Sequence, residues 1–433
     1  MRFKEKEYEK FTKMLDTCSS YSEEALDDKT LTPYERYKKA PIIYKNQIIN
    51  NYGKIASKEF MDDYENVVDI NTYLQDVTNL SSNHDRIHYG KSGKKWILET
   101  TTGSTGKPFT VVKSVQEKLL ESKYLFDQRK QFYKEVTPDN GLLLMQPVDK
   151  FIKSLNYRGN TADNVPLIID YMLETRPKWL LTTTLLLRKI VAAVKEKQLE
   201  DKVKDLHLLF IETTSQALND DEKVAIEDIF GCKVVNQFGC REVWNIAYEC
   251  PCGKMHINDK YLMVDIVDND GKIIEKNGEV GDVIISSFIH KTFPLLKYYL
   301  GDHAYFSGEE CECGNKSPVI VFCGGRQKDK LLGTDIYGTE IFRKIMRFIY
   351  FKHPELGAKD VAILQKNEKD IEVKAFLTKG QEEEFKKYFI DTFNFLVPKH
   401  EFNFEYLFLD EMINDINAEK PEIFKNYHAL KRA

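Results

Sequence analysis

Residues 99–112 read ETTTGSTGKPFTVV, and this stretch says more about the fold than any other part of the chain. It follows the apolar run Trp96-Ile97-Leu98, so the pattern predicts a strand, a polar glycine-containing loop and a second strand. Glycines let backbone amides approach phosphate oxygens, while hydroxyls and a lysine add donors. The stretch is not a Walker A loop, because Thr101 and Pro108 hold positions that need glycine and serine or threonine. The sequence therefore predicts a different phosphate-binding loop, with a plain polar connection as the alternative.

Strand and helix patterns alternate over residues 95–245, after a first section of helices and loops. Apolar runs that predict buried strands lie at 96–98, 141–145, 179–182, 206–213 and 233–237. Helical patterns fall between them at 114–134, 185–197 and 220–229. This alternation predicts an α/β layer with a largely parallel sheet.

The pattern changes after Tyr248. Residues 254–322 are rich in β-branched runs and turns, which predicts an antiparallel, barrel-like section. Glycines at 324 and 325 then precede about 100 residues of mixed α+β pattern and indicate a hinge. The predicted fold class is α/β: an N-terminal domain at 1–324, with mixed sheets flanked by helices plus the barrel-like section, a hinge at 325–328, and a small mobile α+β domain at 329–433.

The composition is that of a globular protein of two or three domains. The chain has 433 residues, of which 42% are apolar and 30% charged. Its 63 basic and 68 acidic residues leave a net charge of −5, which argues against nucleic acid as a partner. No run approaches the roughly 20 apolar residues of a membrane span, and the charged start lacks a signal-peptide core. We therefore expect a cytoplasmic protein without a membrane partner.

Four of the eight cysteines form two matching pairs, Cys250-Pro-Cys252-Gly and Cys311-Glu-Cys313-Gly. In a reducing compartment, such pairs predict a metal site before a disulfide. Together with His256 they offer five ligands for a tetrahedral zinc ion, and cysteine-rich closed zinc sites are normally structural. Reduced cysteines without metal are the alternative.

Three further motifs follow the loop in order. They are Phe238-Gly239-Cys240-Arg241-Glu242, then Lys297-Tyr298-Tyr299-Leu300-Gly301-Asp302, and finally Gly325-Arg326-Gln327-Lys328-Asp329. With the loop, they resemble the signatures of the acyl-adenylate-forming (ANL) superfamily, which includes acyl-CoA synthetases, peptide-synthetase adenylation domains and luciferases. The chain length and the stretch Glu249-Cys250-Pro-Cys-Gly-Lys-Met-His256 most resemble the phenylacetate–CoA ligase and CapK-like group.

The resemblance implies an ATP site. The 100–108 loop would hold the β- and γ-phosphates through Thr101, Thr102, Ser104, Thr105, Gly106 and Lys107. Glu242 would bind Mg²⁺, a hard ion that prefers oxygen ligands. Phe238 and Gly239 would lie near the adenine, Asp302 would accept hydrogen bonds from the ribose hydroxyls, and Arg326 would reach ribose or phosphate. The sequence departs from the family at Arg241, where threonine is usual, and at Lys297, where arginine is usual.

The resemblance also implies a mobile C-terminal domain that supplies a catalytic lysine. Lys328 would lie at the hinge, and Lys420 is the candidate catalytic lysine, with an ordinary surface lysine as the alternative. For zinc, the subfamily favours Cys250, His256, Cys311 and Cys313, with Cys252 spare; an all-cysteine site is the rival.

The predicted reaction activates a small carboxylic acid as acyl-AMP, releases pyrophosphate and transfers the acyl group to CoA. Gln146, Gln237 and Cys240 are the predicted acid-binding residues. The acid stays open, as does an alternative in which the acyl group is transferred to a carrier-protein thiol or an amine, or in which the enzyme adenylates a cofactor. A nucleotide-binding module without catalysis is a third reading, and a homodimer is left open.

Overall fold

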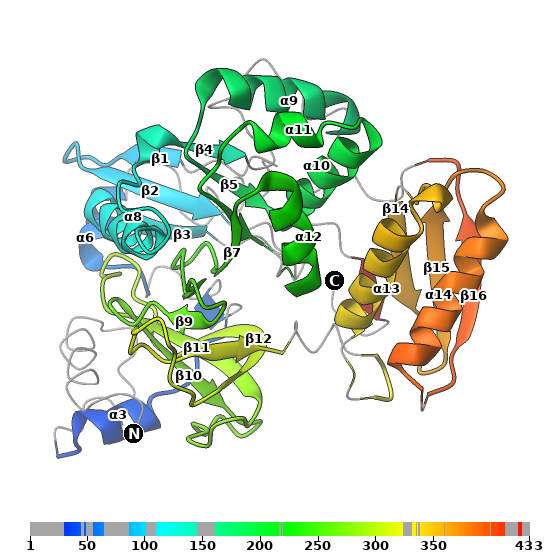
Figure 1. Cartoon of the computed structure of the whole chain (residues 1–433). Helices are drawn as coiled ribbons and strands as arrows, with labels where there is room; N and C mark the ends of the chain where they lie inside the picture. Colours follow the sequence, from blue (N-terminus) through cyan, green and yellow to red (C-terminus); the bar gives the residue numbers. More distant parts are fainter. Residues whose placement is uncertain are drawn as a thin grey trace. The chain divides into compact units, whose positions relative to one another are not determined.

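The computed structural model divides the chain into two compact units. The first comprises Met1–Leu300 and Ala304–Val321, and the second comprises Gly301–His303 and Phe322–Ala433 (Figure 1). The residues described are 30–44, 47–48, 55–64, 86–100, 110–144, 161–215, 218, 220–323, 331–334, 336, 338–358, 360–398, 400–411 and 423–426. No helix among these residues is long and apolar enough to cross a membrane.

A six-stranded sheet of order β4-β5-β6-β7-β8-β9 forms the centre of the first unit. Its strands are β4 (Gly141–Leu144), β5 (Trp179–Thr183), β6 (Phe210–Thr214), β7 (Lys233–Phe238), β8 (Ala247–Glu249) and β9 (Met255–Ile257). The first four strands are parallel, and the last two are antiparallel additions. The connecting helices are α9 (Thr161–Thr175), α10 (Thr184–Glu196), α11 (Glu200–Lys204) and α12 (Asp220–Phe230). The predicted parallel α/β layer is confirmed.

Two boundaries differ from the prediction. The strand predicted at 206–213 begins only at Phe210, because α11 ends at Lys204 and His207 has a positive φ of 54°. Leu206 and Leu208 are buried in this turn, so their apolar character reflects packing rather than strand geometry. The helix predicted to reach residue 134 ends at Arg129.

The predicted strands on either side of the polar loop form a hairpin. The strands β2 (Lys95–Thr100) and β3 (Thr110–Ser114) pair antiparallel, and β1 (Arg86–Tyr89) adds a third, unpredicted strand. The helix α8 (Val115–Arg129) starts directly after β3, because Ser114 and Glu117 form a capping box. The hairpin and α8 are therefore one continuous unit.

A buried ion pair connects α8 to the central sheet. Arg129 donates to both carboxylate oxygens of Glu212 on β6, at 2.6 and 2.9 Å, and its guanidinium lies 4.4 Å from the Trp179 ring centroid. The hydroxyl of Tyr248 donates to the same carboxylate at 2.8 Å. Every charge in this contact is paired and hydrogen-bonded, as burial requires.

The β-rich section after Tyr248 contains a second large sheet, of order β10-β11-β12-β13, which belongs to the first unit except for residues 301–303 and 322. Its strands are β10 (Leu262–Val267), β11 (Gly281–Ser287), β12 (Tyr298–Phe306) and β13 (Ile320–Phe322), and β10 pairs antiparallel with β11. This sheet corresponds to the predicted barrel-like section. The helices α3 (Pro33–Lys39) and α6 (Lys58–Tyr64) precede both sheets in the chain.

The second unit is an α+β domain. Its sheet has the order β16-β15-β14-β17, with β14 (Asp360–Gln365), β15 (Asp370–Phe376), β16 (Asn403–Phe408) and β17 (Phe424–Asn426). The helices α13 (Gly338–Lys352) and α14 (Glu382–Leu396) lie side by side, and an aromatic core with Phe342, Phe385, Phe389 and Phe393 joins them to the sheet (Figure 1). The mixed α+β pattern is confirmed, whereas the hinge and the mobility of this domain stay predictions.

Candidate functional site

Part of the predicted site lies outside the described residues. This part comprises the loop residues Thr101, Thr102, Ser104, Thr105, Gly106 and Lys107, together with Gln146, Arg326, Lys328 and Lys420. Their roles stay predictions. The described part comprises the motif around Glu242, the strand that carries Asp302, and the cysteine pairs.

The motif that follows β7 forms a tight turn, residues 239–245, called here the Glu242 turn. The amide of Trp244 donates to the carbonyl of Cys240 at 2.7 Å, and Trp244 has a positive φ of 60°. Gly239 is required here, because a Cβ at this position would lie 1.6 Å from the carbonyl oxygen of Trp244. The glycine of the motif therefore has a steric cause, which is the close return of the chain.

Glu242 is buried, with 6% of its surface exposed, and a second motif residue holds its side chain. The hydroxyl of Tyr298, the first residue of β12, donates to Glu242 Oε1 at 2.8 Å. Two motifs 56 residues apart thus meet through this hydrogen bond. An ionised carboxylate offers about four lone-pair positions, so the bond leaves acceptor capacity for a cation.

Gln237 and Phe238 directly precede the Glu242 turn and Cys240 lies within it, and all three are half-buried. Burial raises the pKa of the Cys240 thiol well above its usual value, and the negative charge of Glu242 adds to the shift. The thiol is therefore protonated at neutral pH and is no thiolate nucleophile. The predicted acid-binding role of Gln237 and Cys240 stays a prediction.

Lys297 differs most from what its place in the motif suggests. Its ammonium is buried and donates to the carbonyl oxygens of Lys38 and Ala40, both at 3.0 Å, and it lies 4.8 Å from the Tyr37 ring centroid. Burial lowers the pKa of Lys297 to about 8. Lys297 thus binds the carboxyl end of α3, and the cation of this motif has a structural partner inside the first unit.

Asp302 and Arg241 are both half-buried in the structure. Asp302 lies on β12, in the strand that begins with Tyr298. The backbone carbonyl of Arg241 accepts a hydrogen bond from Lys113 at 2.9 Å. The ribose role of Asp302 stays a prediction.

Cys250, His256, Cys311 and Cys313 come together, and their ligand atoms all lie within 4.8 Å of one another. The sulfurs of Cys250 and Cys311 are 3.6 Å apart, and Cys313 Sγ is 3.4 Å from His256 Nε2. Tetrahedral zinc with Zn–S near 2.3 Å and Zn–N near 2.05 Å requires about 3.8 Å and 3.6 Å for these pairs. The spacing fits a tetrahedral ion and is far too long for a disulfide.

The outer hydrogen bond of His256 favours metal binding as well. His256 Nδ1 lies 2.8 Å from the carbonyl oxygen of Ser317, so this nitrogen carries the proton and donates. The lone pair of Nε2 is then directed toward the three sulfurs. Histidine ligands of metals usually have such a partner for the second nitrogen.

The two cysteine pairs form the same turn. In each, the glycine has a positive φ, 78° for Gly253 and 79° for Gly314, and its amide donates to the carbonyl of the first cysteine. The first turn nevertheless supplies only Cys250 to the cluster, because Cys252 is exposed. The subfamily resemblance favours the same four residues and treats Cys252 as spare.

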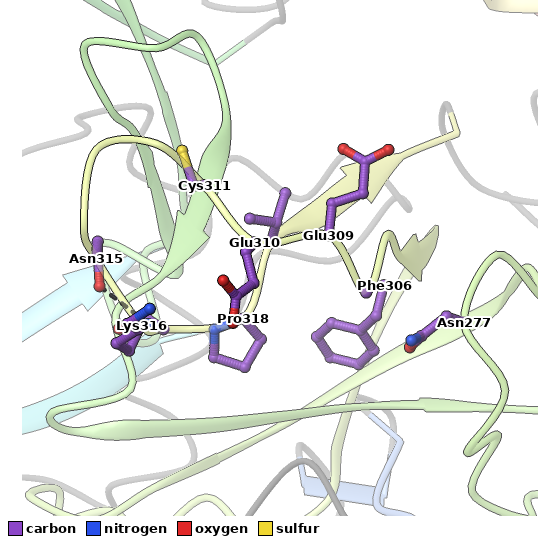
Figure 2. A pocket seen from close by; sticks show the side chains of 11 residues that line it. Asn277, Phe306, Glu309, Glu310, Cys311, Asn315, Lys316 and Pro318 are labelled. Atoms are coloured by element: carbon purple, nitrogen blue, oxygen red, sulfur yellow. Dashed lines mark hydrogen bonds between the residues drawn. The ribbon is translucent and has the colours of Figure 1, made fainter.

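A hollow of about 270 Å³ lies beside the second cysteine turn (Figure 2). Phe306 and Pro318 supply apolar surface, while Glu309 and Glu310 add carboxylates. Glu309 forms an ion pair with Lys254, and Lys316 also lines the hollow, so the charges around it are mixed. Among the predicted site residues the hollow contains only Cys311, so it is not part of the candidate nucleotide site.

Sequence reasoning gave no role to Tyr298 or Lys113. Tyr298 lies inside a motif that resembles the family pattern, so its position carried a signal. Lys113 is a charged residue in the otherwise apolar and hydroxylated strand TVVKS, which is the one local hint of a buried charge. The outer partner Ser317 had no sequence signal.

Solved structures share this architecture. A structure of 2-hydroxyisobutyryl-CoA ligase in the postadenylation state, in complex with 2-HIB-AMP, gives a TM-score of 0.68 at 12% identity, covering 99% of this chain and 90% of its own. The chain has the fold of the acyl-adenylate-forming (ANL) superfamily. The anthranilate CoA ligase AuaEII in complex with anthranoyl-AMP gives 0.53 at 14% identity, covering 74% of this chain and 64% of its own. ATP-bound MatB from Rhodopseudomonas palustris gives a TM-score of 0.52 at 15% identity, covering 77% of this chain and 67% of its own.

A curated relative of this ANL-fold chain is the phenylacetate-coenzyme A ligase of Thermus thermophilus. The two are 26% identical over 192 residues, which cover 42% of this chain and 41% of the relative. No family model matches the sequence. The solved structures thus confirm the fold that the resemblance implies, and the similarity to the curated relative extends over about two fifths of either chain.

Proposed function

We propose that the chain is an AMP-forming ligase, which activates a carboxylic acid as acyl-AMP with release of pyrophosphate and then transfers the acyl group to CoA. The observation that carries the proposal is the buried Glu242, held by Tyr298 where two ANL motifs meet. The relatives and similar structures are named as CoA ligases, which favours CoA as the acceptor.

The electrostatic problem of this reaction assigns the residue roles. A carboxylate must approach an α-phosphate that is itself anionic, and a bound Mg²⁺ would supply the charge that makes this approach favourable. Glu242 would hold that ion, since its buried carboxylate has acceptor capacity beyond the Tyr298 bond. Lys107 and the loop hydroxyls would bind the β- and γ-phosphates, and Asp302 would bind the ribose.

The cysteine cluster would hold a structural zinc ion. Three thiolates and an imidazole match the ligands and spacing of closed zinc sites. The ion would fix the β8–β9 hairpin, which follows the Glu242 turn, to the loop between β12 and β13. With four protein ligands it has no open position for substrate, so its contribution would be to stability.

Acid-dependent ATP–pyrophosphate exchange tests the proposal. The purified chain is expected to exchange pyrophosphate into ATP only when a suitable acid from a panel of aromatic, aliphatic and amino acids is present. Mass spectrometry with CoA, a carrier protein or an amine then identifies the acceptor. Nucleotide binding with no exchange for any acid would contradict the proposal and favour a binding module.

Replacing Tyr298 by phenylalanine is expected to lower the exchange rate about tenfold and to raise the Mg²⁺ concentration for half-maximal rate. A hydrogen bond to a charged group contributes about 1.5–3 kcal/mol, and its loss frees the Glu242 side chain. Tyr299→Phe is the matched control, because its hydroxyl bonds to Asp282 at 3.2 Å. If Tyr298→Phe exchanged pyrophosphate as fast as Tyr299→Phe, the Tyr298 hydroxyl would have no role in supporting the site.

A further inference from the structure

Lys113 is a fully buried lysine whose three ammonium protons all have acceptors. It lies on β3 and donates to Glu99 Oε2 at 2.5 Å, to Glu121 Oε1 at 2.7 Å and to the backbone carbonyl of Arg241 at 2.9 Å. Ile97 pairs with Lys113 across the hairpin, so Glu99 is its diagonal neighbour on the same face. An ammonium has three N–H donors, and Lys113 uses one of them to bind the backbone of the Glu242 turn.

Lys118 makes a second contact with the same turn. It lies on α8, forms an ion pair with Glu99, and places its ammonium 3.3 Å from the ring centroid of Trp244. Such a position over an indole is a cation–π contact. The β2–β3 hairpin and α8 therefore hold the Glu242 turn at two points, the carbonyl of Arg241 and the ring of Trp244.

The far side of the network ends in an imidazole and a hydroxyl. Glu121 Oε1 also lies 2.9 Å from His290 Nε2, and His290 Nδ1 lies 2.5 Å from the hydroxyl oxygen of Ser287. A neutral imidazole with its proton on Nε2 satisfies both bonds. The ammonium groups of Lys113 and Lys118 balance the carboxylates of Glu99 and Glu121.

Stability alone does not explain such a network. A buried ion cluster can often be replaced by apolar side chains of similar volume without loss of stability. Apolar side chains could not reproduce the hydrogen bond to the Arg241 carbonyl, which fixes the backbone next to Glu242. Moreover, β2 and β3 are the strands that lead into and out of residues 101–109, the predicted phosphate loop. The network thus connects the strands of one motif to the turn of another.

We propose that Lys113 and Lys118 are positioning residues for Glu242. They fix the Glu242 turn against the β2–β3 hairpin, so that the carboxylate is preorganised for the metal ion of the nucleotide. This inference rests on the proposed function, because Glu242 has such an ion to hold only if the chain binds magnesium–ATP for adenylation. A displacement of about 1 Å in a reacting geometry can cost about a hundredfold in rate.

The double variant Lys113→Met/Glu121→Gln tests the role of Lys113. It removes the bond to the Arg241 carbonyl and leaves the remaining charges, Glu99 and Lys118, paired. We expect the half-saturating Mg²⁺ concentration in pyrophosphate exchange to rise about tenfold and kcat to fall about tenfold, with the KM for the acid unchanged. A loss of stability alone would lower the amount of folded enzyme and leave the Mg²⁺ dependence as it was.

The matched control is Arg188→Met/Glu222→Gln. Arg188 on α10 donates to both carboxylate oxygens of Glu222 on α12, at 2.8 and 3.0 Å, so the control also removes an ion pair of the first unit, with a buried carboxylate and a half-buried guanidinium. This pair joins α10 to α12 and shares no residue with the Lys113 network. We expect this variant to melt at a lower temperature and to keep the wild-type Mg²⁺ dependence.

Lys118→Gln is a milder second variant, and it tests the positioning role if the double variant does not fold. It can keep a hydrogen bond to Glu99 but loses the charge over Trp244, and we expect about a threefold rise in half-saturating Mg²⁺. Wild-type Mg²⁺ dependence in the folded variants would overturn the inference while leaving the proposed function intact. Absence of acid-dependent exchange in the wild-type enzyme would overturn the proposed function, and the inference would fall with it.

Discussion

Replacing Glu242 by glutamine is expected to lower acid-dependent pyrophosphate exchange by about 10²–10³-fold. A metal ion stabilises transition-state charge by several kcal/mol, and each 1.4 kcal/mol is a factor of ten. Glutamine keeps the shape of the side chain and an oxygen that accepts from Tyr298, but it removes the negative charge that would hold Mg²⁺. The measurement is the exchange rate with the best acid of the panel, at saturating ATP and over a range of Mg²⁺ concentrations.

The control for this prediction is Glu222→Gln, an isosteric change at another buried glutamate of the same unit. It leaves Arg188 without its ionic partner, so we expect a lower melting temperature and unchanged exchange per folded molecule. Glu242→Gln is expected to show the reverse, with nearly unchanged melting and lost exchange. Full exchange by Glu242→Gln, at the wild-type Mg²⁺ requirement, would remove Glu242 from the metal site.

The central sheet was predictable because a strand that is buried on both faces needs a run of apolar residues, which is visible in the sequence. The strand β5 shows this best, because it begins with the apolar run Trp179-Leu180-Leu181 and all of its residues are buried, whereas β4 and β7 are only partly buried. The strand β1 was missed, because its sequence RIHY alternates over only four residues, which is the shortest pattern that indicates a strand. The start of β6 was predicted too early, because Leu206 and Leu208 are apolar residues that are buried in a turn and not in a strand.

The candidate site was predictable only where a motif is continuous in sequence. Glu242 and the four residues Cys250, His256, Cys311 and Cys313 lie in short recognisable stretches, and the structure brings these four together. The bonds of Lys113 join residues 14, 8 and 128 positions away, so no local pattern reveals them. Its strand reads as an apolar strand with a charged end, and only the tertiary structure shows that this charge is buried.

Zinc is expected in the purified chain at about one ion per molecule, and its removal is expected to destabilise the first unit. Structural zinc sites contribute folding free energy directly, with apparent binding free energies on the order of 10–16 kcal/mol in small zinc domains. A strong chelator should therefore lower the melting temperature by several degrees. Exchange activity should survive at temperatures where the chelated protein stays folded, because the proposed ion has no open coordination position.

Two single variants distinguish the ligand sets. With Cys250, His256, Cys311 and Cys313 as ligands, His256→Ala is expected to lose zinc on dialysis, and Cys252→Ser is expected to keep it. The all-cysteine set predicts the reverse, since it would use Cys252 and spare the imidazole. Atomic emission on the dialysed proteins gives the zinc content, and thermal unfolding gives the accompanying stability.

The geometry favours the first outcome, because Cys252 is exposed whereas Nε2 of His256 lies 3.4 Å from Cys313 Sγ. Retention of zinc by both variants would contradict a four-ligand site of either kind.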